Sequence, residues 1–342
     1  MQKLILVAAS TILMGLFLYT SMQNSTKQNL LDTHFSSMAK EINANKNLGW
    51  VANEEYVPFS KAELKKMFNI RRSKTLPSGF SQAPKIDLSD DELPESFNGE
   101  EKWSNCESFK EVRDQSACGS CWAVAAAAAL SDRLCVANEQ KSQKRVSALD
   151  LLSCCDACGD GCQGGELFES FVYAKEKGLV TGGEFGDKNS CKPYPFPPCN
   201  HHSQGPYDEC SQHDYSTPEC TATCVENYSV PYKSDKIFLK KAYSVRGEKQ
   251  IMKDLMTYGS LEVAFDVYED FMLYKSGIYS HTSDTILGGH AVKLVGWGVE
   301  NGIKYWVCVN NWNSNWGEKG AFRIKRGVDE CGIEDDVVGG LF

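Results

Sequence analysis

One cysteine in this sequence stands where a side chain can act as a nucleophile. Cys121 follows the segment Asp114-Gln115-Ser116-Ala117-Cys118-Gly119-Ser120 and opens an alanine-rich apolar run. That run predicts the strongest helix of the chain, over 121–137. Ser120 is then placed to cap the helix N-terminus, where aligned peptide dipoles favour a negative charge and lower the pKa of a thiol. The position of Cys121 therefore predicts a reactive thiolate.

A nucleophilic cysteine needs a base, and the chain contains only six histidines. His290 is framed by glycines in Gly288-Gly289-His290-Ala291-Val292 and is expected to open a β-strand, which would fix its ring. Asn310, at the end of the next expected strand, is suited to orient the imidazole, and Trp312 to shield their hydrogen bond from water. Gln115 can donate its side-chain amide N–H to a developing oxyanion, beside the backbone N–H of Cys121.

Helices are expected before strands along the chain. A second helix fits 165–177 and ends at Gly178, and the region from about 185 to 232 is irregular and rich in Pro, Gly, Cys and His. Beyond residue 258 the pattern turns to strands, at 261–265, 291–295, 304–309 and 320–325. This order predicts an α+β fold with a helical half and a β half.

Three motifs in this order resemble the papain family of cysteine proteases. They are Cys-Gly-Ser-Cys-Trp at 118–122, Gly-Gly-His-Ala at 288–291 and Asn-x-Trp-Asn at 310–313, with about 170 and 20 residues between their key side chains. The resemblance implies a two-lobed fold with the active site in the cleft between the lobes. It also implies that no metal or cofactor is required, and that the catalytic residues are Cys121, His290, Asn310 and Gln115.

Two cysteine-rich segments resemble the cathepsin B group of that family. One is the run 154–165, and the other, from 191 to about 210, is similar to the occluding loop that fills the primed end of the cleft. On this resemblance His201 and His202 bind the terminal carboxylate of a substrate, and Asp114 pairs with His201 to hold the loop shut. Peptidyl-dipeptidase activity is then expected beside endopeptidase activity. A His-His metal site and ordinary surface histidines are the alternatives, but no third ligand or acidic cluster that a metal would need stands nearby in the sequence.

The same resemblance assigns the substrate contacts. Gly164 and Gly289 are expected to meet the substrate backbone, because a side chain there would obstruct the cleft. Glu166 stands where the family usually has Tyr in the specificity pocket, and Asp336 would occupy the pocket floor, one methylene shorter than the usual Glu. The full expected set is Gly164, Gly165, Glu166, Gly289, Trp312 and Asp336, with His201 and His202 in the loop.

Other positions depart from the family pattern. Asn311 stands where the family usually has Ser, and Val124 replaces the usual aromatic after Cys-Trp-Ala. A second ion pair that anchors the loop in family members is missing, because Tyr207 and Asn315 fill its positions. We therefore expect a looser loop and a larger endopeptidase share.

All 15 cysteines lie between positions 106 and 331. Such a density implies an oxidising compartment, and the odd number leaves at least one thiol without an internal partner. Cys121, Cys308 and Cys331 remain free on the family pattern, Cys308 as a small core residue. The resemblance implies six disulfides, namely Cys106–Cys135, Cys118–Cys162, Cys154–Cys220, Cys155–Cys158, Cys191–Cys224 and Cys199–Cys210.

The N-terminus indicates export. A mostly apolar run over 4–19 is followed by a polar stretch, which is typical of a cleaved signal peptide, assigned here to 1–21; a retained membrane anchor is the alternative. We expect a protein of the secretory pathway that ends in the lysosome or in an extracellular or digestive lumen. Sequons at Asn24 and Asn227 permit N-glycosylation.

The cysteine-free stretch 22–92 is expected to form a separate unit. It holds short helical patterns at 32–42 and 60–68, followed by an acidic junction that favours a processing boundary. It is either an N-terminal subdomain or a pro-region that inhibits the mature domain, 93–342, until it is removed. On this view the protein is made as an inactive precursor.

Charge limits the partners. The formal net charge is −9 at pH 7, and the sequence offers no basic patch of the kind that binds nucleic acid. The expected partners are peptide and protein substrates, the chain's own pro-region and cystatin-type inhibitors. We expect a monomer without a membrane span in the mature form.

Two other functions fit parts of the sequence. Cys118-Gly119-Ser120-Cys121 could belong to a thiol–disulfide oxidoreductase, but no strand–helix–strand pattern surrounds it, and His290 and Asn310 would have no role. A protease fold that has lost catalysis and binds a ligand is the second alternative, favoured by Asn311 and Glu166. The intact set of catalytic residue types favours an enzyme.

Overall fold

The computed structural model describes residues 31–56, 64, 67–71, 76–201 and 203–342. The predicted signal peptide, most of the helix predicted at 60–68, Asn24 and His202 lie outside the described residues.

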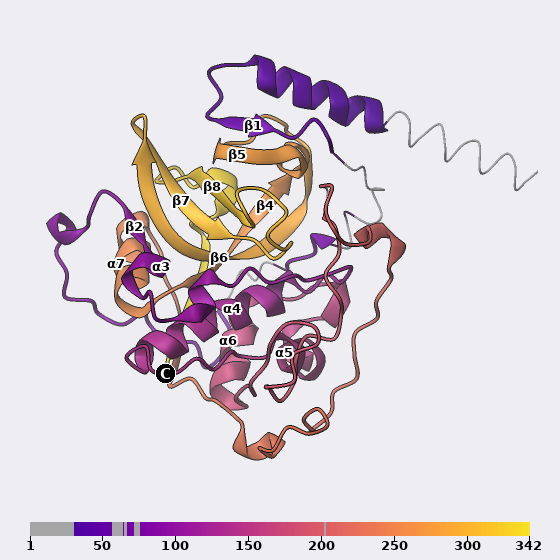
Figure 1. Ribbon diagram of the computed structural model, residues 1–342. Coiled ribbons are helices and arrows are strands. Elements are labelled where there is room, and N and C mark those ends of the chain that lie inside the picture. Colours follow the sequence, from indigo (N-terminus) through magenta and orange to yellow (C-terminus); the bar gives the residue numbers. More distant parts are fainter. Residues whose placement is uncertain (1–30, 57–63, 65–66, 72–75, 202) are drawn as a thin grey trace, which may run out of the picture.

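One buried helix forms the centre of the helical lobe. α4 (Cys121–Ala137) is buried along nearly its whole length, because its Ala and Leu side chains are apolar on every side. α5 (Ala148–Cys154) and α6 (Leu167–Glu176) pack against it (Figure 1). α6 falls within the predicted helix at 165–177, and Gly178 follows it with φ +69°, a conformation that favours glycine.

The described strands form one sheet. Its order is β1-β5-β8-β7-β6-β4-β9-β3, with β2 paired to β6 off this path, and β5 and β8 are its only parallel neighbours. The four predicted strands are present as β4, β6, β7 and β8, although β6 is longer than predicted. The bounds are β1 Trp50–Ala52, β2 Phe97–Asn98, β3 Lys241–Ser244, β4 Leu261–Tyr268, β5 Tyr274–Tyr279, β6 Ile286–Glu300, β7 Ile303–Val309, β8 Ala321–Lys325 and β9 Asp336–Leu341.

Shorter helices and turns complete the fold. Residues 31–44 are helical and lie over β1 and β5, on the side of the sheet away from α4 (Figure 1). Phe35, Ala39 and Ile42 of this helix are buried in the same core as Trp50 of β1. The remaining elements are α3 Gly99–Lys102, α7 Glu248–Tyr258, η1 Asp90–Glu92, η2 Glu107–Lys110, η3 Asp156–Cys158, η4 Gly161–Gln163, η5 Cys210–Gln212, η6 Tyr232–Ser234, η7 Glu269–Leu273 and η8 Glu330–Gly332.

A buried ion pair ties α4 to the β half. Arg133 of α4 pairs with Asp254 of α7, and both side chains are 1% exposed. The same guanidinium donates to the hydroxyl of Tyr243 in β3 at 2.8 Å and to the carbonyl of Gly340 in β9 at 3.0 Å. Removing one partner would leave an uncompensated buried charge, at a cost of roughly 3–5 kcal/mol. The helix that begins at Cys121 is therefore held in one position against the sheet.

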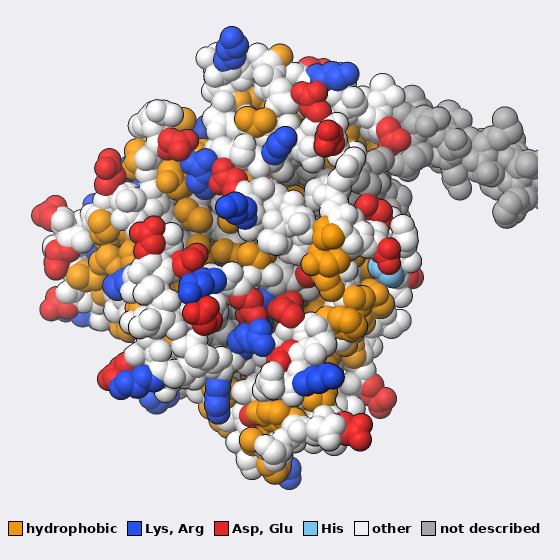
Figure 2. Space-filling view, viewed as in Figure 1, with side chains coloured by type: hydrophobic (Ala, Val, Ile, Leu, Met, Phe, Trp, Pro, Cys, Tyr) orange, Lys and Arg blue, Asp and Glu red, His pale blue; other side chains and the backbone are white. Residues whose placement is uncertain are grey.

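The described residues form an α+β protein, with α4, α5 and α6 on one side and the sheet on the other (Figure 1). The predicted fold class is confirmed. No helix in the described part of the chain is long and apolar enough to span a bilayer. On the face in Figure 2, acidic and basic side chains are interspersed, and no basic patch gathers over its described residues.

Candidate active site

Cys121 is the first residue of α4 and is 1% exposed. The turn before it is fixed by the disulfide Cys118–Cys162 and by the N–H of Gly119, which donates to the carbonyl of Cys162 at 2.8 Å. Ser120 occupies the N-cap position, but its hydroxyl makes no cap and lies 2.7 Å from the hydroxyl of Tyr194. The predicted cap is wrong, because the buried Tyr194 hydroxyl takes Ser120 as its partner.

His290 lies inside β6, opposite Phe265 of β4, and is fully buried. The prediction that it opens a strand is wrong, since β6 already begins at Ile286. Nε2 of His290 lies 2.8 Å from Oδ1 of Asn310, the residue directly after β7. Nδ1 of His290 has no hydrogen-bond partner among the described residues. One ring nitrogen of His290 is thus held by Asn310, and the other makes no hydrogen bond within the described part of the chain.

The thiol of Cys121 lies beside this histidine. The backbone N–H of Ala291, the residue after His290, lies near enough to the thiol to lower its pKa, against the larger effect of burial. Cys121 and Ala291 belong to one buried cluster. Trp312, also fully buried, packs on the His290 ring with 5.0 Å between ring centroids. Trp312 therefore covers the His290 ring, and its shielding of the His290–Asn310 hydrogen bond stays a prediction.

Gln115 is fully buried in the segment that precedes α4. Its amide Nε2 donates to the carbonyl of Cys118 at 2.8 Å, and its Oε1 accepts from Nε1 of Trp312 at 3.2 Å. A side-chain amide has two N–H donors, so one remains beyond the bond to Cys118. These contacts fix the amide plane of Gln115 between Trp312 and the turn that leads to Cys121.

Two residues without a predicted catalytic role connect these groups. The side-chain amide of Asn311 donates to the backbone carbonyl of Ala291 at 2.9 Å, and the backbone carbonyl of Asn311 accepts from the backbone N–H of Gln115 at 2.9 Å. The hydroxyl of Tyr194 donates to the carbonyl of Gln115 at 2.7 Å. Asn311 was singled out only as a departure from the family pattern, and no local sequence signal marks Tyr194.

Burial favours the neutral forms of both Cys121 and His290 while the N-terminal segment is present. Burial raises the pKa of the Cys121 thiol to about 12, and lowers the pKa of His290 to about 4 against the opposing hydrogen bond from Asn310. The sequence predicted a lowered thiol pKa. The direction is opposite here because loss of solvent outweighs the favourable helix N-terminus.

Residues 68–71 of the N-terminal segment cover the site. The backbone N–H of Ile70 donates to the carbonyl of Gly289 at 3.3 Å, and that of Arg71 to the carbonyl of Gly165 at 2.9 Å. A Cβ added at Gly164 would lie 2.0 Å from the carbonyl oxygen of Asn69, so only glycine allows this approach. The glycines predicted to meet a substrate backbone therefore meet the chain's own backbone.

The segment 191–210 reaches the same site through His201, which contacts Asp114 and Trp312. His201 is 1% exposed, and its Nε2 lies 2.7 Å from Oδ1 of Asp114. The other oxygen of Asp114 accepts from the side-chain amide of Asn313 at 2.8 Å and from the backbone N–H of Cys199 at 3.2 Å. The His201 ring stacks on Trp312 at 5.7 Å between centroids, so His201 and His290 both pack on Trp312. The predicted contact between Asp114 and His201 is present.

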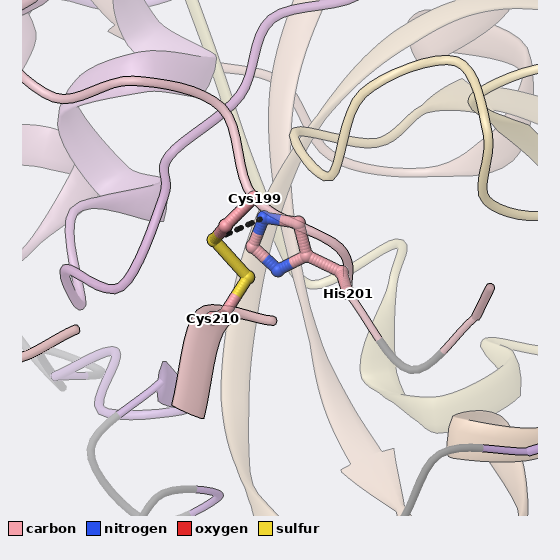
Figure 3. Close-up of side chains that lie close together, drawn as sticks. All are labelled: Cys199, His201 and Cys210. Atoms are coloured by element: carbon pink, nitrogen blue, oxygen red, sulfur yellow. Dashed lines mark hydrogen bonds between the residues drawn. A yellow bond between two sulfur atoms is a disulfide. The ribbon is translucent and has the colours of Figure 1, made fainter. Parts of the chain in front are cut away.

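Figure 3 shows that His201 points toward the disulfide Cys199–Cys210. Nε2 of His201 lies 3.7 Å from Sγ of Cys199, and the three side chains group like a metal site. Both sulfur atoms are consumed by the disulfide, so neither can act as a thiolate ligand. The histidine serves the contact with Asp114 instead.

The remaining predicted pocket residues lie at the border of the two halves. Glu166 is the N-cap residue of α6, and Asp336 is the first residue of β9, paired with Ala264 of β4. Both are half-buried, and α6 packs against both β4 and β9. Val124 is buried inside α4.

The structure forms six disulfides and leaves three cysteines free. The pairs are those that the resemblance implied, and the free residues are Cys121, Cys308 and Cys331. Three of the pairs, Cys154–Cys220, Cys191–Cys224 and Cys199–Cys210, fasten the irregular region between α6 and β3. That region owes its shape to these crosslinks.

The fold and this constellation agree with three comparisons. The family described as papain family cysteine protease matches residues 93–341. A cathepsin B-like cysteine proteinase of Schistosoma japonicum is 42% identical over 96% of this chain and 97% of its own length. Cathepsin B-like cysteine proteinase 6 of Caenorhabditis elegans is 47% identical over 88% of this chain and 81% of its own.

A solved structure agrees as well. ProCathepsin B S9 from Trypanosoma congolense superimposes with a TM-score of 0.77 at 36% identity, over 89% of this chain and 97% of that one. The chain belongs to the papain family of cysteine proteases. Within that family its similarity is to the cathepsin B-like proteinases and their precursors, which confirms the predicted two-lobed fold with an N-terminal pro-region.

Proposed function

We propose that the mature chain hydrolyses peptide bonds through a Cys121–His290 pair. Nδ1 of His290 takes the proton of the Cys121 thiol. The resulting thiolate attacks the peptide carbonyl carbon, and the oxyanion accepts hydrogen bonds from Gln115 and from the Cys121 backbone N–H. His290 then protonates the leaving amine, and a thioester to Cys121 remains. Water, deprotonated by His290, attacks the thioester and releases the acid and the free thiol.

The observation that carries this proposal is the environment of His290. Asn310 holds Nε2 at 2.8 Å, and the buried Nδ1 has no partner among the described residues, while the neighbouring Ala291 lies in the same buried cluster as Cys121. A neutral imidazole that donates from Nε2 presents Nδ1 as its acceptor. This tautomer supports a proton transfer from the Cys121 thiol to Nδ1 of His290.

We assign residues 1–21 to a signal peptide, 22–92 to the pro-region and 93–342 to the mature peptidase. The contacts of residues 68–71 with Gly164, Gly165 and Gly289 support an inhibitory role, because they occupy the backbone positions that a substrate would use. The pro-region thus acts as an inhibitor in cis, and its removal opens the cleft.

We also propose C-terminal dipeptidase activity. His201 is fixed by Asp114 and shares Trp312 with His290, so it lies at one end of the catalytic group. Its Nδ1 is buried and has no partner among the described residues. A substrate's terminal carboxylate would supply that partner, together with His202, whose own placement lies outside the described residues.

The loop 191–210 lacks the second ion pair that anchors it in family members, which supports endopeptidase activity beside dipeptidase activity. Tyr207 is 41% exposed, and neither it nor Asn315 can form an ion pair. We therefore propose substantial endopeptidase activity, because the loop can yield to a longer substrate. The carboxylates of Glu166 and Asp336 favour a pocket that accepts Arg as well as apolar side chains.

The experiment compares two matched peptides, one with a free C-terminus and one amidated, cleaved by the matured enzyme. We expect dipeptides from the free peptide and cleavage of the amidated peptide at a similar rate. Strict dependence on the free carboxylate would contradict the yielding loop, and an absence of dipeptides would contradict the role of His201. Asp114→Asn should shift the ratio toward the amidated peptide, whereas Asp208→Asn, an exposed carboxylate of the same loop, should leave it unchanged.

The same proposal sets the location and partners. The dense disulfides favour the secretory pathway, with a lysosomal or extracellular destination, and the sequon at Asn227 would carry a glycan there. We propose that the mature enzyme is a monomer that acts on peptides and proteins and is blocked by cystatin-type inhibitors. No cofactor enters the mechanism.

A further inference from the structure

Away from the active site, three side chains with metal-binding atoms meet where the connection after β5 contacts the connection before β9. They are His281, shortly after β5, and Glu330 and Cys331 in η8, before β9. Nδ1 of His281 lies 2.6 Å from Oε1 of Glu330. Sγ of Cys331 lies 3.9 Å from that Nδ1 and 3.7 Å from that Oε1. The proposed hydrolysis uses none of these groups.

Hydrogen bonds and ring stacking hold His281 and Glu330 in place within the cluster. The backbone N–H of His281 donates to Oε1 of Glu330 at 2.9 Å, so the carboxylate is fixed by two bonds from one residue. The His281 ring stacks on Tyr268 with 4.2 Å between centroids and 15° between planes. Cys331 has φ +56°, a left-handed conformation that is costly for a side-chain-bearing residue. The surrounding fold therefore holds Cys331 in this costly conformation, and this places its thiol beside Glu330.

The surroundings carry an excess of negative charge. The carboxylates that act on the Cys331 thiol are those of Glu330, Asp270 and Asp266, and Asp284 adds to the charge near Tyr268. Asp270 is itself held by the hydroxyls of Tyr279 and Thr282, so it contributes charge rather than a ligand atom. A cation at the cluster would reduce this repulsion.

We propose that His281, Glu330 and Cys331 bind one zinc ion. Imidazole nitrogen, carboxylate oxygen and thiolate sulfur are the three donor types that zinc takes in proteins. Tetrahedral zinc places such donors roughly 3.3–3.6 Å apart, given its usual bond lengths. The distances from Sγ of Cys331 to Nδ1 of His281 and to Oε1 of Glu330, 3.9 and 3.7 Å, are already close to that range. The distance between Nδ1 of His281 and Oε1 of Glu330, 2.6 Å, needs to increase by less than about 1 Å.

The charges of the three side chains and their exposure to solvent are both compatible with a bound Zn²⁺. A thiolate and a carboxylate together neutralise Zn²⁺, so the loaded cluster adds no net charge to a buried region. The side chain of His281 is 37% exposed, that of Glu330 10%, and Cys331 is 6% exposed. The ion therefore enters past His281, and water completes the coordination on that side. Oxidative pairing with an outside thiol is disfavoured by the same burial of Cys331.

The zinc would crosslink two distant parts of the chain. His281 belongs to the connection between β5 and β6, whereas η8 leads directly into β9, which begins at Asp336. A ligand that binds only the folded chain stabilises it in proportion to the logarithm of its concentration. Zinc should therefore raise the thermal midpoint of the protein.

The test measures zinc binding to the full-length precursor carrying Cys121→Ala, by equilibrium dialysis and calorimetry. That substitution removes the Cys121 thiol, which beside His290 would itself attract zinc. We expect one zinc per chain, and binding at least tenfold weaker in Cys331→Ser and in Glu330→Gln. Cys308→Ser, which changes the other buried free cysteine, is the matched control and should bind as before.

Cobalt supplies an independent readout. Co²⁺ bound in this cluster should show a sulfur-to-cobalt absorption that Cys331→Ser abolishes and Cys308→Ser retains. Equal zinc affinity in Cys331→Ser and its parent, or no binding to the parent at all, would overturn the proposal. If Cys331→Ser fails to fold, as its thermal transition would reveal, Glu330→Gln and His281→Gln decide the question, because both side chains are at least partly exposed.

Discussion

Oδ1 of Asn310 lies 2.8 Å from Nε2 of His290, and both side chains are buried. His290 lies in β6, and Asn310 directly follows the neighbouring strand β7. Because a carbonyl oxygen can only accept, this contact assigns the ring hydrogen to Nε2 and leaves Nδ1 as the basic nitrogen. The bond therefore selects both the orientation and the tautomer of His290.

Asn310→Ala should lower kcat about tenfold to a hundredfold, by analogy with the loss of a group that orients a metal-ligating histidine. KM should change little, since we place Asn310 behind His290 and not against the substrate. Steady-state kinetics on the matured enzyme give both values. Asn189→Ala, at an exposed position, is the control, and an unchanged kcat in Asn310→Ala would contradict the orienting role.

Gln115→Ala should lower kcat by roughly a hundredfold to a thousandfold, because the oxyanion loses a preorganised donor. The substrate's ground-state carbonyl gains less from that donor, so KM should again move little. The variant Gln250→Ala, exposed on α7, controls for the loss of an amide. A loss of kcat below fivefold in a folded Gln115→Ala variant would remove Gln115 from the oxyanion site.

The precursor should protect Cys121 from alkylation by iodoacetamide. Its thiol pKa is raised to about 12 by burial, so the thiolate fraction stays small at neutral pH and grows about tenfold per pH unit. The alkylation rate of the precursor should therefore rise through pH 9 without a plateau. In the mature enzyme we expect fast alkylation with a plateau at much lower pH, since solvent then reaches the pair. Identical pH profiles of alkylation in the precursor and in the mature enzyme would show that residues 68–71 do not protect the Cys121 thiol.

Phe68→Ala should weaken the hold of the pro-region. The Phe68 ring is 3% exposed and contacts the rings of His290 and Trp312 at 5.6 and 5.8 Å between centroids. Deleting a buried phenylalanine costs roughly 3–5 kcal/mol, more than a hundredfold in a binding constant. The variant precursor should mature faster and show activity at pH values where the parent is latent. Leu76→Ala, 47% exposed in the same region, should behave like the parent.

The sequence predicted the parts of the site that depend on local motifs. Cys121 opens a helix, His290 follows a glycine pair and Asn310 follows a strand, and each of these signals lies within a few residues of the side chain it marks. The fold class was predictable for the same reason, since α4, β4, β6 and β7 have strong local patterns.

What the sequence missed depends on contacts between distant segments. Tyr194 lies 79 residues from Gln115, whose carbonyl accepts its hydroxyl hydrogen, and that partnership also takes Ser120 away from its predicted cap. The raised thiol pKa could not be predicted either, because it arises from solvent excluded in the closed precursor and not from residues near Cys121 in sequence.

The most direct test labels acid-matured protein with an epoxide inhibitor of cysteine proteases and follows turnover of a dipeptide-arginine fluorogenic substrate. We predict one label per chain, located at Cys121 by peptide mass analysis, with loss of turnover in proportion to labelling. Cys121→Ala should show neither label nor turnover. Absence of both label and turnover in the parent, after confirmed removal of the pro-region, would contradict the account and indicate a protease fold that binds ligands without cleaving them.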